Sequence, residues 1–372
     1  MERVKAKIAR VDSIDFWRGI ILVSIFINHI PGNVFESYTH KNIGYSDATE
    51  AFVFLSGLSV ALAYGRRFIS GEITLPFQAI RRRILTIYSV QFFLSLAAIA
   101  LFLAAAFLFD DDGLFAEHGR DIILDKPIKA LLAIAGLSHQ IGYFNILPLY
   151  IVLLVATPAM LALARQNMSL MLGVSFAIYI LARLFDINLP TWPVEGQWFF
   201  NPFTWQLLYC LGLYIGLQMH RINDFRNSSF FIVALVTMVL SFILVTGVFS
   251  TAPELKIASE GLLDLSKTNL GLARFIHFMA LTYVIFYLSL HKFLKVQPIY
   301  DALCLIGRHS LPVFAAGSLL SSVGQIMMQT ASIHLALWDE FILVGAGIAI
   351  LYLVARTSAF RRQQSRMTQK TA

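Results

Sequence analysis

The sequence predicts an all-α, polytopic membrane protein with about ten transmembrane helices. Of its 372 residues, 58% are hydrophobic and only 14% are charged, whereas charged residues make up about a quarter of a soluble domain. The mean hydropathy is +0.70, and apolar runs long enough to cross a bilayer recur along the whole chain. These observations exclude an ordinary soluble domain. The net charge of +7 is therefore attributed to orientation in the membrane rather than to nucleic-acid binding.

The predicted spans follow one another without a soluble domain, a repeat or a low-complexity segment. The first one is interpreted as retained rather than cleaved, because no small-residue cleavage site follows His29. A short re-entrant or interfacial helix is expected at 128–138. The whole chain, 1–372, is predicted to be one membrane domain with its core at 11–356 and a basic cytoplasmic tail at 357–372. The ten spans are expected at 14–30, 47–64, 84–109, 146–164, 168–185, 203–219, 229–249, 270–290, 310–329 and 338–355.

The basic residues divide unequally between the two sides that an even number of spans defines. The side holding both termini carries 20 lysines and arginines, the other carries 7, and the remaining two, Arg18 and Arg274, lie within spans. Because cytoplasmic loops are enriched in lysine and arginine, both termini are predicted to be cytoplasmic. The two cysteines, Cys210 and Cys304, have no spacing typical of a disulfide framework or a metal site, so no metal is expected.

The first span carries ionisable residues on one helical face. Arg18 and His29 are eleven residues apart, which returns to nearly the same face about 16 Å further along an α-helix. Asp15 lies on the same stripe, beside Arg18. Ionisable residues inside a membrane are costly and mark functional sites. The alternative is that Arg18 snorkels to the inner headgroups while His29 lies in the outer interface.

The second span begins with two acidic residues, Asp47 and Glu50, at the depth where the first span ends. Consecutive spans with a short connection are usually antiparallel neighbours, which would bring Glu50 close to His29. A carboxylate beside a histidine raises its basicity and favours a general base. The alternative is an acidic residue at a helix start, favoured by the helix dipole, and Glu50 could serve both purposes.

Several motifs resemble known families of membrane acyltransferases. The spacing from Arg18 to His29 resembles the R-x10-H signature of the large integral-membrane acyltransferase family, and "TEAFVFLSG" (49–57) and "GRHSLPVF" (307–314) resemble two further motifs of that family. Glu50 replaces its usual aspartate. The OpgC family is a closer resemblance, through the block from Arg18 to Gly57, "YFNILPLYIVLL" (143–154) and "NPFTWQLLYCLG" (201–212).

The resemblance implies an enzyme of the bacterial inner membrane that transfers an acyl group, in OpgC proteins succinyl, from cytoplasmic acyl-CoA to hydroxyls of an osmoregulated periplasmic glucan. It implies acyl-CoA, with succinyl-CoA the expected donor, as a co-substrate and no bound cofactor. His29 would act as the base, helped by Glu50, through direct transfer or through an acyl-histidine. Donor binding would involve Arg18 with Asp15. Arg66 and Arg67, with Arg81 to Arg83, could bind the CoA phosphates, although these five also fit the positive-inside rule alone.

Further candidates would bind the acceptor or the acyl group. They are Asn28, Asp47, His139, Tyr143, Asn145, Asn201, Trp205, Gln206, Arg274 and His277. Helix capping and packing are equal alternatives for the amides and aromatics. Arg274 is the best candidate for a carboxylate-binding residue, because guanidinium matches carboxylate in a bidentate fashion. It could equally pair with Asp264 or Glu260 in the preceding loop.

The main alternative function is a transporter or flippase of an anionic lipid or sugar, since sparse charges within spans also fit that class. Transporters often show repeats and broken helices at matching positions, and the sequence has no such pair. The expected partners are acyl-CoA, a periplasmic glucan and the lipid bilayer. The oligomeric state stays open, a homo-oligomer included.

Overall fold

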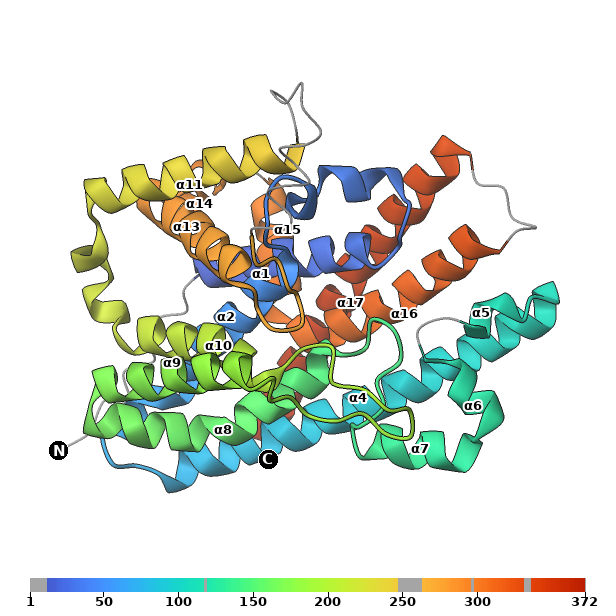
Figure 1. The fold of residues 1–372 in the computed structure, drawn as a ribbon, viewed down its shortest axis with the longest axis horizontal. Coiled ribbons are helices and arrows are strands. Elements are labelled where there is room, and N and C mark those ends of the chain that lie inside the picture. Colours follow the sequence, from blue (N-terminus) through green and yellow to red (C-terminus); the bar gives the residue numbers. More distant parts are fainter. Residues whose placement is uncertain (1–11, 117–118, 247–262, 296–297, 331–335, 372) are drawn as a thin grey trace.

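The computed structural model describes residues 12–116, 119–246, 263–295, 298–330 and 336–371. Within these ranges the regular secondary structure is helical, apart from a single isolated bridge between Pro190 and Gln197. The predicted all-α class is therefore confirmed for the described residues. Figure 1 shows long helices running side by side, with irregular loops gathered near the middle of the molecule.

Each of the ten predicted spans coincides with a helix. They are α1 (Asp12–Asn28), α2 (Ala48–Val60), α4 (Thr74–Phe109), α8 (Ile146–Gln166), α9 (Met168–Leu184), α10 (Pro202–Leu217), α11 (Ser228–Thr246), α13 (Leu272–Leu288), α16 (Ser310–Gln329) and α17 (Leu337–Thr371). Six helical stretches of the described residues are long and apolar enough to cross a membrane, and α9 and α13 are shorter apolar helices. These helices make the chain a membrane protein, whereas the number ten and the orientation of the termini stay predictions.

Shorter helices connect the long ones. The helix expected near 128–138 is present as α7, and the others were not predicted. They are η1 (Val34–Tyr38), η2 (His40–Asn42), the π-helical turn η3 (Ala61–Gly65) that continues α2 into α3 (Arg66–Ile69), α5 (Gly113–Ala116), α6 (Asp121–Asp125), α7 (Pro127–Ala135), η4 (Met219–Phe225), α14 (His291–Leu294) and α15 (Pro298–Arg308).

The first helix is held between α15, α16 and α2. Gly19 and Gly307 allow the backbones of α1 and α15 to touch, because a Cβ on either one would overlap a backbone carbonyl of the other helix. At the same contact Arg308 Nε donates to Asp15 Oδ2 over 3.3 Å and Arg308 Nη2 donates to Asp12 Oδ1 over 3.1 Å. The N-terminal part of α1 is therefore fixed by a partner that lies almost 300 residues later in the chain.

Helices α2 and α10 also pack through small residues. A Cβ on Gly57 would overlap the carbonyl oxygen of Tyr209, and a Cβ on Gly212 would overlap that of Phe54. Small residues that let two backbones approach closely are typical of helix pairs in membranes. This contact fixes α2, whose first turn carries Glu50 and is capped by Asp47, against α10.

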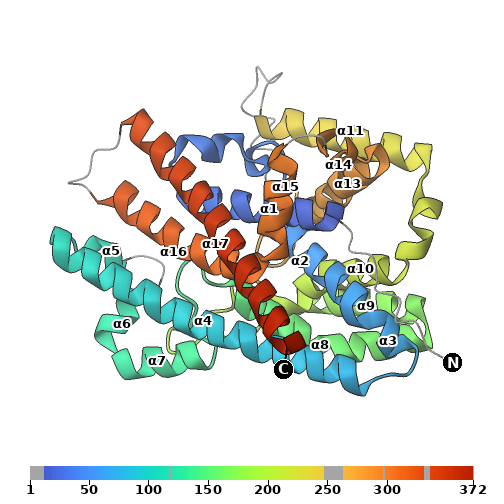
Figure 2. The same cartoon turned by 180° about the vertical axis from the view of Figure 1, so that it is seen from behind.

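The last helix is longer than predicted. Instead of ending near 355, α17 continues to Thr371, so the residues of the predicted basic tail that the structure describes are helical. Figure 2 shows α17 running diagonally across the front of this view, past α16 and over α4. The charged segment from Arg356 onwards therefore extends one rigid element, because nothing in its sequence breaks the helix.

Candidate functional site

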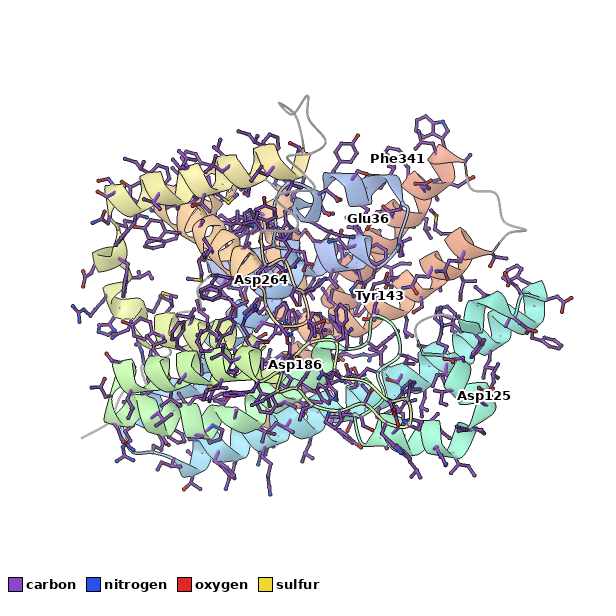
Figure 3. All side chains as sticks on the ribbon, viewed as in Figure 1. Glu36, Asp125, Tyr143, Asp186, Asp264 and Phe341 are labelled. Carbon is purple, nitrogen blue, oxygen red and sulfur yellow. The ribbon has the colours of Figure 1, made fainter. Side chains whose placement is uncertain are left out.

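A cavity of about 560 Å³ opens where α1 ends and α2 begins. Loops from distant parts of the chain close around it: the 137–145 segment before α8, the 186–201 segment after α9 and the 263–271 segment before α13. Figure 3 labels Tyr143, Asp186 and Asp264 near this convergence. The lining residues are Ile25, Asn28, His29, Lys41, Asp47, Ala48, Thr49, Gly119, His139, Gln140, Gly142, Tyr143, Asn145, Ile146, Thr191, Val194, Gln197, Phe199, Phe200 and Lys267.

His29 lies directly after α1, on the wall of this cavity. Its position is fixed from both sides, since its backbone N–H closes the last turn onto Ile25 and its carbonyl accepts a 2.8 Å hydrogen bond from Gln325 Nε2. The ring of Tyr143 lies 4.7 Å from the imidazole, centroid to centroid. Neither imidazole nitrogen has a hydrogen-bond partner among the described residues, so both are free to meet a substrate.

The two acidic residues of α2 have different surroundings. Asp47 and Glu50 form a capping box, in which Asp47 Oδ1 accepts from the N–H of Thr49 and Glu50 Oε2 accepts from the N–H of Asp47, both over 2.8 Å. Glu50 is fully buried and does not line the cavity, whereas Asp47 does. The helix-start role of Glu50 is present, and its side chain engages Arg274 rather than His29. Asp47 is the acidic residue that shares the cavity with His29.

Arg274 forms ion pairs with both of these carboxylates. Its Nη2 lies 2.6 Å from Glu50 Oε1 and 3.2 Å from Asp47 Oδ2, and its Nε donates to Glu50 Oε1 over 2.8 Å. Asp264, one predicted partner, instead pairs with Arg183, and Glu260 lies outside the described residues. The guanidinium is not on the cavity wall. The structure thus gives Arg274 two carboxylates of its own chain in place of a substrate carboxylate.

His277 has a structural environment too. It is buried, and its Nδ1 accepts a 3.2 Å hydrogen bond from the N–H of Ser46 and lies 2.8 Å from the Ser46 hydroxyl. A Cβ on Gly44 would overlap its ring, so the chain before α2 needs glycine there. His277 therefore anchors the 44–46 segment to α13 and does not line the cavity.

Besides Asp47, four of the predicted acceptor residues lie on the wall beside His29. Asn28 Oδ1 accepts from the Thr39 hydroxyl over 2.7 Å, and His139 Nε2 lies 2.8 Å from the Gly119 carbonyl. Tyr143 supplies the ring next to His29. The side chain of Asn145 has no hydrogen bond among the described residues, which leaves its amide free toward the cavity.

The predicted trio Asn201, Trp205 and Gln206 lies behind the wall. Asn201 Oδ1 caps α10 through the N–H of Phe203, and its Nδ2 donates to Asn269 Oδ1 over 2.9 Å. Trp205 Nε1 donates to the carbonyls of Lys267 and Thr268 over 3.1 Å. Gln206 exchanges hydrogen bonds with Ser175 on α9. These contacts are those of the alternative interpretation, capping and packing. Asn201 and Trp205 hold the 263–271 segment in place, and Gln206 joins α10 to α9.

A second, much smaller cavity of about 30 Å³ lies nearer the N-terminal end of α1. Arg18 lines it, as the stripe on α1 predicted, together with Arg83 from α4. The other lining residues are Ile21, Leu22, Phe52, Ser56, Tyr150 and Ser310. Of the predicted donor residues, Arg66 and Arg67 are exposed on α3 and Asp15 binds Arg308, so none of these three reaches this cavity.

Sequence reasoning missed two charged residues of the larger cavity, Lys41 and Lys267. Arg83, which lines the smaller cavity, belongs to the basic run 81–83 that was a weaker candidate for donor binding. Lys41 and Lys267 lie in loops, where no periodicity reports which way a side chain faces. Both belong to the seven basic residues on the side opposite the termini. Their scarcity on that side was the one sequence feature that could have marked them as functional candidates.

The fold and the cavities define an integral membrane protein of helical hairpins with polar sites toward both ends of its first helix. Residues 10–363 match the OpgC protein family, nearly the whole chain, and the chain therefore belongs to that family. No curated protein and no solved structure matches it.

Proposed function

We propose that the protein is a membrane O-acyltransferase that moves an acyl group, succinyl in the first instance, from cytoplasmic acyl-CoA to a hydroxyl of a periplasmic glucan. The observation that carries the proposal is His29, which lines a cavity of about 560 Å³ and whose imidazole nitrogens have no hydrogen-bond partner in the described part of the chain. The family membership supports the acyl transfer. A cavity of this size with amide and aromatic walls accommodates part of a sugar chain.

In the proposed reaction the neutral imidazole of His29 takes the proton of the acceptor hydroxyl. The hydroxyl oxygen attacks the thioester carbon, and the tetrahedral intermediate collapses by expelling the thiolate of CoA, which takes the proton back from the imidazolium. The free amide of Asn145 is our candidate donor to the oxyanion, since preorganised donors stabilise such intermediates. An acyl-histidine intermediate would use the same imidazole, and acid quenching followed by peptide mass analysis distinguishes the two routes.

The donor would bind toward the opposite end of α1. Arg18 and Arg83 supply positive charge at the smaller cavity, which suits an anionic part of acyl-CoA. The two cavities share no lining residue, and Leu22 and Ile25 are buried between them. The thioester arm would therefore pass along α1 only when its neighbours move apart, which makes donor binding a conformational step.

The test uses the protein purified in detergent with succinyl-CoA and a periplasmic glucan, with product mass as the readout. His29→Ala should lower transfer by about 100-fold or more, the usual contribution of a general base. His220→Ala is the matched control, because His220 is exposed on η4 and far from the lining residues. Absence of transfer by the wild type with every acyl-CoA tried would refute the acyltransferase. A His29→Ala variant as active as His220→Ala would refute the assigned base.

A further inference from the structure

Two lysines reach the cavity of His29 from separate loops. Lys41 belongs to η2, between α1 and α2, and Lys267 belongs to the 263–271 segment before α13. The Lys41 ammonium lies 2.6 Å from Glu36 Oε1, and the Lys267 ammonium lies 2.5 Å from Asp47 Oδ2. Each lysine is thus positioned by a carboxylate of the chain itself.

Both ammonium groups keep binding capacity toward the cavity. The side chains of Lys41 and Lys267 are 44% and 35% exposed. An ammonium carries three donors, and each of these two makes one hydrogen bond with the described residues. Two donors per lysine therefore remain for a molecule in the cavity.

The charge balance of the wall favours an anion. Asp47 is the one acidic residue among the lining residues, and Arg274 binds it from behind the wall. Glu36, the partner of Lys41, is not on the wall. The two lysines therefore outnumber the one aspartate on the wall itself, while Arg274, Glu36 and Glu50 behind it bring the whole cluster to charge balance. A recessed site concentrates the field of the groups on its wall. Arg274 is not among the lining residues, and its Nε and Nη2 already donate to Glu50 and Asp47.

We propose that Lys41 and Lys267 bind an anionic group of a substrate while its reacting atom lies at His29. The group is either the terminal carboxylate of a dicarboxylic acyl chain or an anionic substituent of the acceptor. The proposal rests on the proposed function for what the cavity holds. It adds residues that would select between charged and uncharged substrates.

The test has two parts. The first part, on the donor, measures binding affinity, which requires no turnover. The detergent-purified protein is titrated calorimetrically with succinyl-CoA and with acetyl-CoA, which differ in the terminal carboxylate. If the lysines bind that carboxylate, the wild type prefers succinyl-CoA by about tenfold or more, as expected for hydrogen bonds to a charged group. The Lys41→Met, Lys267→Met double variant should lose the preference, and Lys267→Arg should retain most of it.

The second part, on the acceptor, compares acyl transfer to a neutral glucan with transfer to the same glucan carrying phosphate groups. If the lysines bind an anionic acceptor, the double variant loses the preference for the phosphorylated glucan and leaves the two donor affinities in the wild-type ratio. Lys129→Met is the matched control, since Lys129 is exposed on α7 and not on the wall. Losing the Lys267–Asp47 pair could also disturb the structure. Gel filtration detects such a disturbance, and the ratio of transfer to the two glucans, unlike the absolute rate, does not depend on how much of the variant is folded.

The inference is overturned if the double variant keeps the wild-type ratio for both donors and both acceptors, or if the wild type discriminates in neither part. Failure of the proposed function has a different signature. In that case the wild type transfers nothing to either glucan, while the affinity ratio for the two donors still reports whether the lysines bind a carboxylate.

Discussion

At the residue scale, the cluster of Asp47, Glu50, Lys267 and Arg274 decides how the outer cavity is built. Two carboxylates from the start of α2 meet a lysine and an arginine from more than 200 residues later. The pair of Glu50 and Arg274 is almost removed from solvent, with side-chain exposures of 0% and 12%. Taking Glu50 away would leave the buried Arg274 with only its longer contact to Asp47, which Lys267 already shares.

Replacing Glu50 with alanine should therefore lower the free energy of unfolding by about 3–5 kcal/mol, the range found when a buried pair loses one partner. Chemical unfolding in detergent, followed by circular dichroism, measures it. Asp224→Ala is the comparison, because the Arg221–Asp224 pair is 62% and 63% exposed and such pairs contribute about 0–1 kcal/mol. Equal losses in both variants would contradict the buried character of the Glu50 pair.

The same cluster shows which part of the site the sequence could predict. Helical periodicity predicted that Arg18 and His29 share one face of the first helix, and each of them lines a cavity. The identity of their neighbours depends on contacts across the chain, which periodicity does not report. Glu50 was therefore expected beside His29 and is found on Arg274, and Lys267 was not singled out at all.

At the element scale, the contact of α2 with α10 depends on glycine. The backbones of the two helices touch at Gly57 and Gly212, so a side chain at either position must push the helices apart. The start of α2 carries Asp47 to the cavity wall, and α10 carries Trp205, which holds the 263–271 segment. A shift between these helices would therefore displace two sides of the cavity.

Gly57→Ala is expected to destabilise the protein by about 1–3 kcal/mol, the usual cost of forcing extra atoms into a packed contact. Gly173→Ala on α9 is the matched change, since a Cβ there meets nothing within 4 Å. It should stabilise by about 0.5–1 kcal/mol, because alanine is the better helix former. Unfolding curves of the two variants, measured side by side, should move in opposite directions, and a shift in the same direction would contradict the packing argument.

Hydropathy located all ten long helices, because a bilayer demands long apolar runs whatever the tertiary structure. It missed α15, whose eleven residues mix apolar and charged side chains and gain their stability by packing on α1. The loops that close the cavity were also out of reach of sequence reasoning. Their course is set by single hydrogen bonds, such as those from Trp205 to the carbonyls of Lys267 and Thr268.

At the scale of the whole molecule, orientation decides whether the His29 cavity can serve an external acceptor. The split of 20 to 7 basic residues predicts that both termini and the η4 segment are cytoplasmic, while the 186–201 segment is external. Val194 and Gln197 of that segment line the cavity. The cavity therefore lies toward the same side of the membrane as this segment.

Single cysteines at three exposed positions test this orientation. We expect a membrane-impermeant maleimide to label Glu195→Cys in intact spheroplasts, and to label Asp224→Cys and Gln363→Cys only after lysis. The native thiols give little background, because Cys210 and Cys304 are buried and burial raises the pKa of the Cys304 thiol, which keeps it in the unreactive protonated form.

Each position answers a separate question. Labelling of Gln363→Cys before lysis while Asp224→Cys stays protected would put the two positions on opposite sides, and would contradict the even number of spans predicted between them. Labelling of Glu195→Cys only after lysis would place the His29 cavity on the cytoplasmic side. In that case a cytoplasmic donor and the base would lie on the same side of the membrane. The separation of Arg18 and His29 along α1 would then no longer connect a cytoplasmic donor site with an external acceptor site. The labelling pattern thus tests the topology and, independently of any activity assay, the side from which the acceptor reaches His29.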